Sequence, residues 1–367
     1  MLEKREDFYA ILSVTLKKWQ IPETSSPLNE DVYVANKYLN FVAHPNLPDR
    51  IFSNLIAEYS HSSNFWKSIL QKIYVKLAVH AFFRKLFAHQ SILLPIRYSD
   101  KLILGGNHRL RIFNSSLSAS TVILKQGEAK EFIKNEINVR KNYSLDYAPS
   151  LLDYGKDWLK EEYITGLPLN RINNNSQKQA IIPKLINTHL SALTKASIKY
   201  ITKEEYVHRA RQKADKILSN NQISISSSIK ANINTTLKEI IKHIHTNELQ
   251  VAWSHGDFQE GNVLVNENEF KVIDWEASEV RFWLYDFFVM LGNSRAHGDM
   301  HLALKQFKRK FALFFPTYSL PQNWASLLML EELLYTLNED CCENYFHSGR
   351  KAFRLTQQIT KIGFNED

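Results

Sequence analysis

Residues 251–275 read VAWSHGDFQEGNVLVNENEFKVIDW, and this stretch decides the fold. The pattern predicts a strand, a loop, and then two strands joined by the polar bend at residues 266–269. Asp257 lies in the loop, Asn262 precedes the second strand, and Asp274 follows the third. Because the open end of a hairpin brings the start of one strand beside the end of the next, we expect Asn262 and Asp274 to lie close together, with Asp257 beside them.

These residue types suit phosphoryl transfer. Carboxylate and amide oxygens are the ligands that Mg²⁺ prefers, so Asn262 and Asp274 are the predicted metal ligands. A separate aspartate, Asp257, is placed to orient a hydroxyl acceptor and receive its proton. We expect His255 to brace the loop through hydrogen bonds.

The motif spacing carries a family resemblance. The five-residue step from Asp257 to Asn262 is also found in protein-kinase catalytic loops, which read His-Arg-Asp. Here the loop reads His-Gly-Asp, and the second metal ligand lies in Ile-Asp-Trp. This pair of departures resembles the aminoglycoside phosphotransferase and choline kinase-like family, whose signature is HGDxxxxN followed by IDW or IDF. The resemblance implies an α+β, bilobal protein kinase-like fold with a small β-rich N-lobe and a larger helical C-lobe. It also implies ATP and Mg²⁺ as cofactors, with Asp257 and His255 in the catalytic loop.

A glycine turn and a lysine precede this stretch in the order expected of a kinase. Gly105, Gly106 and Asn107 separate two predicted strands, and resemble the flap that covers nucleotide phosphates. A Gly-Gly-Asn sequence is also typical of a simple hairpin turn. The strand 121–125 ends at Lys125, which resembles the lysine that binds the α- and β-phosphates.

Two further nucleotide-site elements follow from the resemblance. In the helix after Lys125, Glu136 is the expected partner of that lysine, and Glu131 is the alternative. Residues 157–166 resemble the hinge strand that contacts adenine through its backbone, so Glu162 and Ile164 are assigned to the hinge by main-chain position.

Composition limits the class of protein. The 367 residues carry a net charge of +8 with a pI near 9.2, which favours anionic partners. No Lys/Arg-rich arm with interleaved aromatics occurs, so we expect no nucleic-acid partner. Cys341 and Cys342 are adjacent and poorly placed for a scaffold disulfide, which favours a reducing compartment. The N-terminus lacks a signal-peptide core, and no apolar run reaches the length of a membrane span, so we expect a cytoplasmic protein.

Three segments are predicted: an extra N-terminal helical region (1–95), the N-lobe (96–165) and the C-lobe (166–367) with the catalytic loop and acceptor-binding helices. Within the first, residues 64–88 predict a long helix with an apolar face made of Trp66, Ile69, Leu70, Ile73 and Leu77. Two interpretations stay open for it. It packs on the kinase core, or it lies on an anionic membrane surface at the inner face of the membrane with Phe82, Phe83 and Phe87 inserted.

The acceptor is left open among a sugar, an amino alcohol, an aminoglycoside and a surface-polysaccharide intermediate, that is, a small molecule or a glycan. An acidic patch in the last segment is compatible with a cationic acceptor, although a solvated helix face is the commoner cause of such a patch; it comprises Glu331, Glu332, Glu339 and Asp340. The alternative function is a catalytically silent nucleotide-binding module that acts through its N-terminal helices. A protein-kinase activity is disfavoured because no Ala-Pro-Glu segment follows Asp274.

Overall fold

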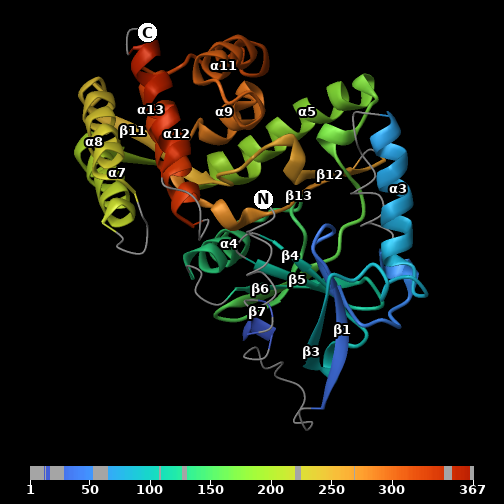
Figure 1. Ribbon diagram of the computed structural model, residues 1–367. Coiled ribbons are helices and arrows are strands. Elements are labelled where there is room, and N and C mark those ends of the chain that lie inside the picture. Colours follow the sequence, from blue (N-terminus) through green and yellow to red (C-terminus); the bar gives the residue numbers. More distant parts are fainter. Residues whose placement is uncertain are drawn as a thin grey trace. The chain divides into compact units, whose positions relative to one another are not determined.

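The chain divides into two compact units (Figure 1). Unit 1 comprises residues 1–133 and 149–165, and unit 2 comprises residues 134–148 and 166–367. The structure is a computed structural model that describes residues 12, 14–16, 29–52, 65–106, 109–125, 130–219, 225–267, 269–342 and 349–363. The division between the units falls within helix α4 (Glu131–Asn142).

Unit 1 is built on an eight-stranded antiparallel sheet with the strand order β3-β1-β2-β4-β5-β6-β8-β7. Its strands are β1 (Glu30–Asn36), β2 (Phe41–Ala43), β3 (Gln90–Pro95), β4 (Leu102–Gly105), β5 (Arg109–Phe113), β6 (Ala119–Leu124), β7 (Leu151–Tyr154) and β8 (Trp158–Glu162). Both faces of the sheet are covered: Val42 of β2 packs in one apolar cluster, whereas its neighbours Phe41 and Ala43 pack in another. This alternation follows from the two-residue period of a strand.

The N-terminal segment departs from the expectation of a mainly helical region. It contains one long helix, α3 (Phe65–Val79), but β1, β2 and β3 also lie within residues 1–95 and join the sheet through β2 and β4. Val32–Ala35 is a continuous apolar run with two β-branched residues, which favours a strand, and Tyr33, Val34 and Ala35 are all buried in β1, which pairs with β3. The sheet of the N-lobe is therefore extended by the N-terminal segment.

Helix α3 packs through the face opposite to the predicted apolar stripe. Val75, Ala78 and Val79 are buried in the core of unit 1. Trp66 and Leu70 are 72% and 66% exposed, respectively. Because successive residues turn by about 100° around a helix axis, Val75 and these two side chains fall on opposite sides. Packing of α3 on a core is thus observed, but not through the expected residues.

The turn that follows α3 is held by a buried arginine. The guanidinium of Arg84 donates to the carbonyl oxygens of Val79, Pro45 and Leu47 at 2.5–3.1 Å and pairs with Asp49 at 2.9 Å. These contacts satisfy a cation that is otherwise costly to bury.

Unit 2 is mainly helical and contains two small sheets, β10-β11-β14 and β13-β12-β9. Its helices are α5 (Asn175–His189), α6 (Lys195–Ser197), α7 (Lys203–Leu218), α8 (Ser227–Lys242), α9 (Tyr285–Gly292), α10 (Ser294–His297), α11 (Met300–Phe314), α12 (Trp324–Cys342) and α13 (Arg350–Ile362). Its strands are β9 (Leu167–Pro168), β10 (Lys199–Thr202), β11 (Glu248–Ser254), β12 (Val263–Asn266), β13 (Glu269–Val272) and β14 (Glu279–Phe282). Every residue of α9 is buried, so this helix forms the centre of the core.

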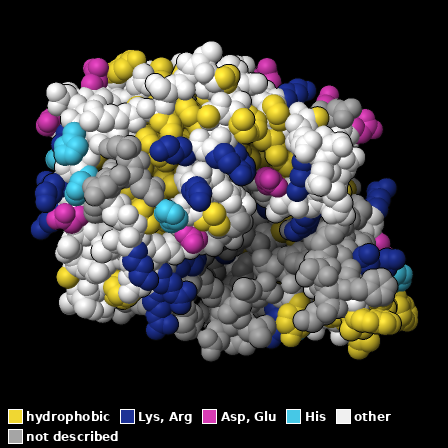
Figure 2. Space-filling view, turned by 90° about the horizontal axis from the view of Figure 1, so that it is seen from above, with side chains coloured by type: hydrophobic (Ala, Val, Ile, Leu, Met, Phe, Trp, Pro, Cys, Tyr) yellow, Lys and Arg dark blue, Asp and Glu magenta, His cyan; other side chains and the backbone are white. Residues whose placement is uncertain are grey.

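The surface mixes charges of both signs. Figure 2 shows basic side chains together with acidic and histidine side chains on one face. Within the described residues, no helix is both long and apolar enough to cross a membrane.

Candidate active site

The hairpin of β12 and β13 brings Asn262 and Asp274 to its open end. Val263 pairs with Val272, and the Ile273 N–H donates to the Asn262 carbonyl at 2.9 Å. Asp274, the next residue, adopts a left-handed backbone conformation (φ 69°) that turns the chain out of the strand. The expected juxtaposition of these two residues is therefore observed.

Asp257 lies beside them. Its Oδ2 accepts hydrogen bonds from Asn262 Nδ2 at 2.9 Å and from Gln259 Nε2 at 2.8 Å. Asn262 Nδ2 also donates to the Asp257 carbonyl at 2.9 Å. The structure thus brings together the three residues on which the predicted chemistry depends.

His255 braces the loop, as the sequence predicts. It is fully buried, its Nδ1 accepts the Asp257 N–H at 3.2 Å, and its Nε2 lies 3.0 Å from the Ile273 carbonyl. Since a carbonyl oxygen only accepts, the ring carries its proton on Nε2 and is neutral. Burial lowers the pKa of His255, which favours this neutral form. His255 ties the start of the loop to the strand before Asp274.

Asp286 in α9 also holds this loop, through hydrogen bonds to its backbone and to Ser254. Its Oδ1 accepts from Ser254 Oγ at 2.6 Å and from the Gly256 N–H at 2.9 Å, and its Oδ2 accepts from the His255 N–H at 2.6 Å and from His189 Nε2 at 2.8 Å. Burial opposes ionisation, but the hydrogen bond and charge of His189 outweigh it and lower the pKa of Asp286 to about 2. The family resemblance implies an aspartate here that caps the helix and braces the catalytic loop. The bracing is observed, whereas no side-chain hydrogen bond caps the start of α9.

Gly256 is required by the path of the loop. Its φ of +84° is a conformation that L-residues with side chains rarely adopt. A Cβ atom at this position would lie 2.2 Å from the Ala277 carbonyl oxygen. The close approach lets the loop pass directly over the segment that follows Asp274.

Arg295 is a site residue that the sequence did not reveal. Its Nε donates to Asp257 Oδ1 at 3.1 Å, its Nη2 to the Tyr285 hydroxyl at 2.8 Å, and its Nη1 pairs with Glu332. The guanidinium lies 3.8 Å from the ring centre of Tyr335. Arg295 stands in the short helix α10, 38 residues after Asp257, and no local motif marks it.

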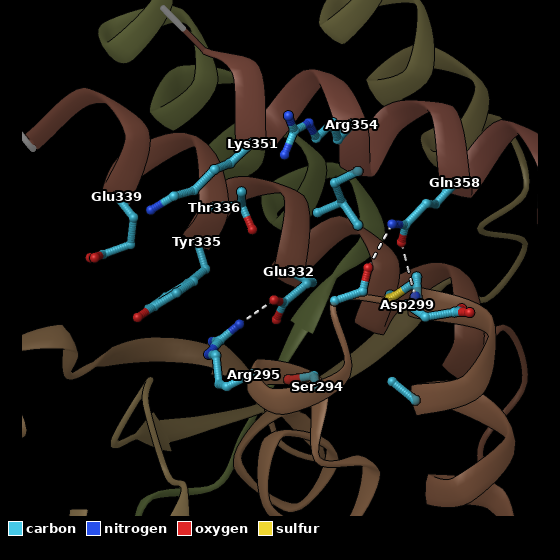
Figure 3. A pocket seen from close by; sticks show the side chains of 14 residues that line it. Ser294, Arg295, Asp299, Glu332, Tyr335, Thr336, Glu339, Lys351, Arg354 and Gln358 are labelled. Atoms are coloured by element: carbon cyan, nitrogen blue, oxygen red, sulfur yellow. Dashed lines mark hydrogen bonds and ion pairs between the residues drawn. The ribbon is translucent and has the colours of Figure 1, made fainter. Parts of the chain in front are cut away.

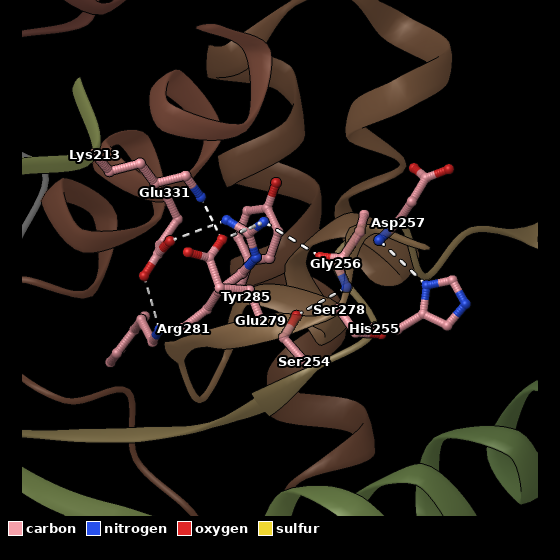
Figure 4. Close-up of polar contacts among 12 residues, drawn as sticks. Lys213, Ser254, His255, Gly256, Asp257, Ser278, Glu279, Arg281, Tyr285 and Glu331 are labelled. Atoms are coloured by element: carbon pink, nitrogen blue, oxygen red, sulfur yellow. Dashed lines mark hydrogen bonds and ion pairs between the residues drawn. The ribbon is translucent and has the colours of Figure 1, made fainter. Parts of the chain in front are cut away.

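The acidic patch of α12 is not a solvated helix face. Glu331, Glu332 and Asp340 are buried, with exposed fractions of 5%, 6% and 1%. Glu331 accepts from the Phe282 N–H at 2.8 Å and pairs with Arg281 at 3.4 Å (Figure 4). These carboxylates have partners that are distant in the sequence, and the contacts with them offset the cost of burying a charge.

A model of the phosphotransferase enzyme family matches residues 162–324. The resemblance to the aminoglycoside phosphotransferase and choline kinase-like family is confirmed. No curated protein matches this sequence.

Solved structures of aminoglycoside phosphotransferase APH(4)-Ia share the fold. Its ternary complex with ADP and hygromycin B is similar at a TM-score of 0.51 and 14% identity, over 72% of this chain and 94% of that chain. Its complex with AMP-PNP and hygromycin B gives a TM-score of 0.50 and 14% identity, over 71% and 93%. A choline kinase from Cryptosporidium parvum gives a TM-score of 0.44 and 14% identity, over 69% and 85%. The α+β protein kinase-like fold predicted from the sequence is confirmed.

In this kinase-like chain, unit 1 contains the predicted glycine turn and lysine. Gly105 ends β4, and the Gly106 N–H donates to the Arg109 carbonyl at 2.8 Å. Lys125 directly follows β6 and its Nζ donates to the Gly106 carbonyl at 2.5 Å. Asn107, also predicted to contact nucleotide, lies outside the described residues. The expected neighbourhood of glycine turn and lysine is therefore observed within this unit.

The remaining predicted nucleotide-site residues are divided between the units. Glu162 ends β8 in unit 1, where its carboxylate accepts from the Ser150 N–H at 3.2 Å, and Ile164 lies two residues further on. Glu136 belongs to unit 2 and pairs with Arg140 at 2.7 Å, whereas Lys125 belongs to unit 1. The nucleotide-binding roles of these residues stay predictions.

A cavity of about 450 Å³ lies within unit 2, beside Arg295 (Figure 3). It is bounded by residues of α10 to α13, including Glu332 and Tyr335 of α12 and Arg354 of α13. Its volume is in the range of small-molecule sites, which is about 300–1,000 Å³. Because Arg295 both lines this cavity and binds Asp257, the candidate base is one side chain away from it.

Proposed function

We propose that this protein transfers the γ-phosphoryl group of ATP to a hydroxyl group of a small molecule or glycan. The observation that carries the proposal is the contact of Asp257 with Asn262, and of Asn262 with the strand that delivers Asp274. The family match supports a phosphotransferase enzyme. The neighbour APH(4)-Ia, whose complexes contain ADP or AMP-PNP and hygromycin B, supports a nucleotide and a small-molecule acceptor.

The donor set at the hairpin fits Mg²⁺. Asn262 turns its amide nitrogen toward Asp257, which leaves the amide oxygen as the metal-binding atom of that side chain. Asp274 supplies a carboxylate directly beyond the hydrogen bond between Ile273 and Asn262. One amide and one carboxylate are typical of Mg²⁺ that is shared with substrate phosphates. Held by Asn262 and Asp274, Mg²⁺ would neutralise negative charge on the phosphates.

Asp257 acts as the base in this proposal. Its carboxylate is held by Asn262, Gln259 and Arg295, so its orientation is set before an acceptor binds. Such positioning contributes much of the rate in phosphoryl transfer, where the protein does little covalent chemistry. Lys125 and the backbone of Gly105 and Gly106 are proposed to bind the phosphates.

The test is Mg²⁺-dependent ATP turnover across a panel of amino alcohols, sugars, aminoglycosides and glycan fragments. Wild type is compared with Asp257→Asn and with Asp215→Asn, a control at an exposed position of α7. We expect acceptor-stimulated turnover in wild type and in the control, and a loss of about 100-fold or more in Asp257→Asn. Tight ATP binding without turnover for any acceptor would favour the alternative, a silent nucleotide-binding module. Equal turnover in all three proteins would contradict the role of Asp257.

We also propose that residues 64–88 bind an anionic membrane surface. Trp66, Leu70 and Ile73 are exposed on one face of α3, and Phe82 and Leu86 are 81% and 78% exposed on the turn held by Arg84. Contiguous exposed apolar residues are uncommon on soluble proteins and mark interaction sites. The exposed basic side chains of this segment favour anionic lipid; they include Lys72, Lys76 and Lys85. Of the phenylalanines expected to insert, Phe87 packs on the core of unit 1 instead.

Vesicle flotation tests this surface. We expect wild type to bind vesicles containing phosphatidylglycerol and not pure phosphatidylcholine, and Leu70→Glu to bind neither. Leu313→Glu is the matched control, because Leu313 is 74% exposed in α11, outside the segment. Equal vesicle binding by wild type and Leu70→Glu would refute the proposal. If wild type instead forms dimers in solution and Leu70→Glu does not, a second copy of the chain covers this face of α3.

A further inference from the structure

The hydrogen bonds of Asp257 leave one acceptor position vacant. A carboxylate offers about four lone-pair sites, two on each oxygen. Oδ2 accepts from both Asn262 and Gln259, whereas among the described residues Oδ1 accepts only from Arg295. The remaining site is therefore on Oδ1, the oxygen next to the arginine that lines the cavity. A hydroxyl group that comes within hydrogen-bond distance beside Arg295 can donate to this oxygen.

The cavity also contains a polar group without a partner. The Oγ atom of Ser294 is buried and makes no hydrogen bond within the described residues. Ser294 lines the cavity next to Arg295. A buried hydroxyl normally has a partner, because its desolvation is costly otherwise. This end of the cavity is therefore suited to a polar ligand.

The acidic side chains of the cavity are largely balanced. Glu332 pairs with Arg295, and the carboxylate of Asp299 caps α11 by accepting the Leu302 N–H at 3.1 Å. Glu339 and Lys351 also line the cavity and carry opposite charges. These groups together contribute little net charge for recognising a cationic ligand.

The three acidic and three basic side chains of the lining balance in number, and Arg354 is the basic side chain that has no ion pair within the described residues. It lines the cavity from α13, and it makes no ion pair or hydrogen bond with the part of the chain that the structure describes. Figure 3 shows it across the cavity from Ser294 and Arg295. Guanidinium groups bind carboxylates and phosphates in a two-pronged geometry.

We propose that this cavity binds an acceptor that carries an anionic group, a carboxylate or a phosphate, at Arg354 and presents its reactive hydroxyl to Asp257 Oδ1. The inference rests on the proposed function. The hydroxyl proton passes to Oδ1, and the oxygen electron pair forms a bond to the γ-phosphorus of ATP. The bond from that phosphorus to the β,γ-bridging oxygen breaks, and ADP leaves with its electron pair. Arg295 lines the cavity and donates to Oδ1, and is a positioning residue that fixes the orientation of this oxygen.

Matched pairs of acceptors test the proposal. Glucose is compared with glucuronic acid and with glucose 6-phosphate in wild type, Arg354→Gln and Arg350→Gln. Arg350 is exposed on the same helix and does not line the cavity, so it is the control. We expect an anionic member to have a KM at least about tenfold lower than glucose in wild type and in the control, and Arg354→Gln to lose that difference in KM. A preference for glucose, or one that survives Arg354→Gln, overturns the inference.

A binding measurement separates this inference from the proposed function. Titration calorimetry of the same sugars without nucleotide reports on the cavity alone. Binding of an anionic sugar that Arg354→Gln weakens about tenfold, in a protein that phosphorylates no acceptor, would support the cavity assignment and contradict the kinase reaction. Turnover of neutral or cationic acceptors, without binding that depends on Arg354, would support the kinase reaction and overturn the cavity assignment. Neither binding nor turnover of the anionic sugars would also overturn it.

Discussion

Replacing Asp286 by asparagine removes the charge that holds the catalytic loop. The hydrogen bonds and charge of His189 outweigh burial and lower the pKa of Asp286 from 3.8 to about 2. At about 1.4 kcal/mol per unit, the ionised form contributes about 2 kcal/mol to folding at neutral pH. Asparagine also places an NH₂ group against two of the four donors, whichever way its amide turns. Unpaired buried donors cost about 1–3 kcal/mol each, so two of them, added to the lost charge, give an expected total loss of at least about 4 kcal/mol.

Urea unfolding, followed by tryptophan fluorescence, measures this loss against wild type and the exposed control Asp215→Asn. Because the folded pKa of Asp286 is depressed, its stabilisation is complete only well above the unfolded value of 3.8 and is lost as the pH falls toward the folded value of about 2. The difference between wild type and Asp286→Asn is therefore constant from pH 7 to pH 5 and narrows below pH 4. A difference below about 1 kcal/mol at pH 7 would refute the reasoning, since it implies that the four contacts contribute little. If the difference in unfolding free energy between the two proteins instead narrows above pH 5, the pH dependence would come from the titration of a histidine.

Two further substitutions, one in each unit, test contacts that hold a loop or a turn in place. Gly256→Ala places a side chain on a residue with a left-handed backbone and against the Ala277 carbonyl. Urea unfolding is therefore expected to show a free energy of unfolding lower by about 2–4 kcal/mol, and turnover is expected to fall at least tenfold. Wild-type stability and turnover in this variant would contradict the argument from the geometry of the loop. Arg84→Met leaves carbonyl oxygens and Asp49 without their cationic donor, so thermal unfolding of unit 1 is expected at lower temperature, with a loss of about 3 kcal/mol. The exposed Lys85→Met is the control for that change, and an equal effect of both would refute the role of Arg84.

The sequence predicts the hairpin of β12 and β13 because every contact that defines it is local. The turn fixes the register, and the register places Asn262 against Ile273. Asp257 follows because a five-residue loop allows its carboxylate to reach the Asn262 amide. The expected positions of Lys125 and the glycine turn are likewise set by adjacent strands, β4 to β6.

Long-range partners could not be predicted in the same way. Arg295 reaches Asp257 only because α9 and α10 pack against the loop, and an arginine in a short helix has no pattern that reveals this. Glu331 and Glu332 have the composition of an exposed helix face, and their burial depends on Arg281 and Arg295. The exposed stripe of α3 has the opposite cause: the helical period identifies an apolar face but not what covers it.

The two aspartates of the site differ in how fully their lone pairs are used, and this difference indicates which one is the base. Asp286 accepts four hydrogen bonds, two on each oxygen, and is buried with no site for a further donor. Asp257 accepts three and is only partly buried. A proton from an acceptor hydroxyl can be received only where an acceptor position is vacant. Asp286 therefore fixes the loop, whereas Asp257 keeps the capacity to bind and deprotonate a substrate.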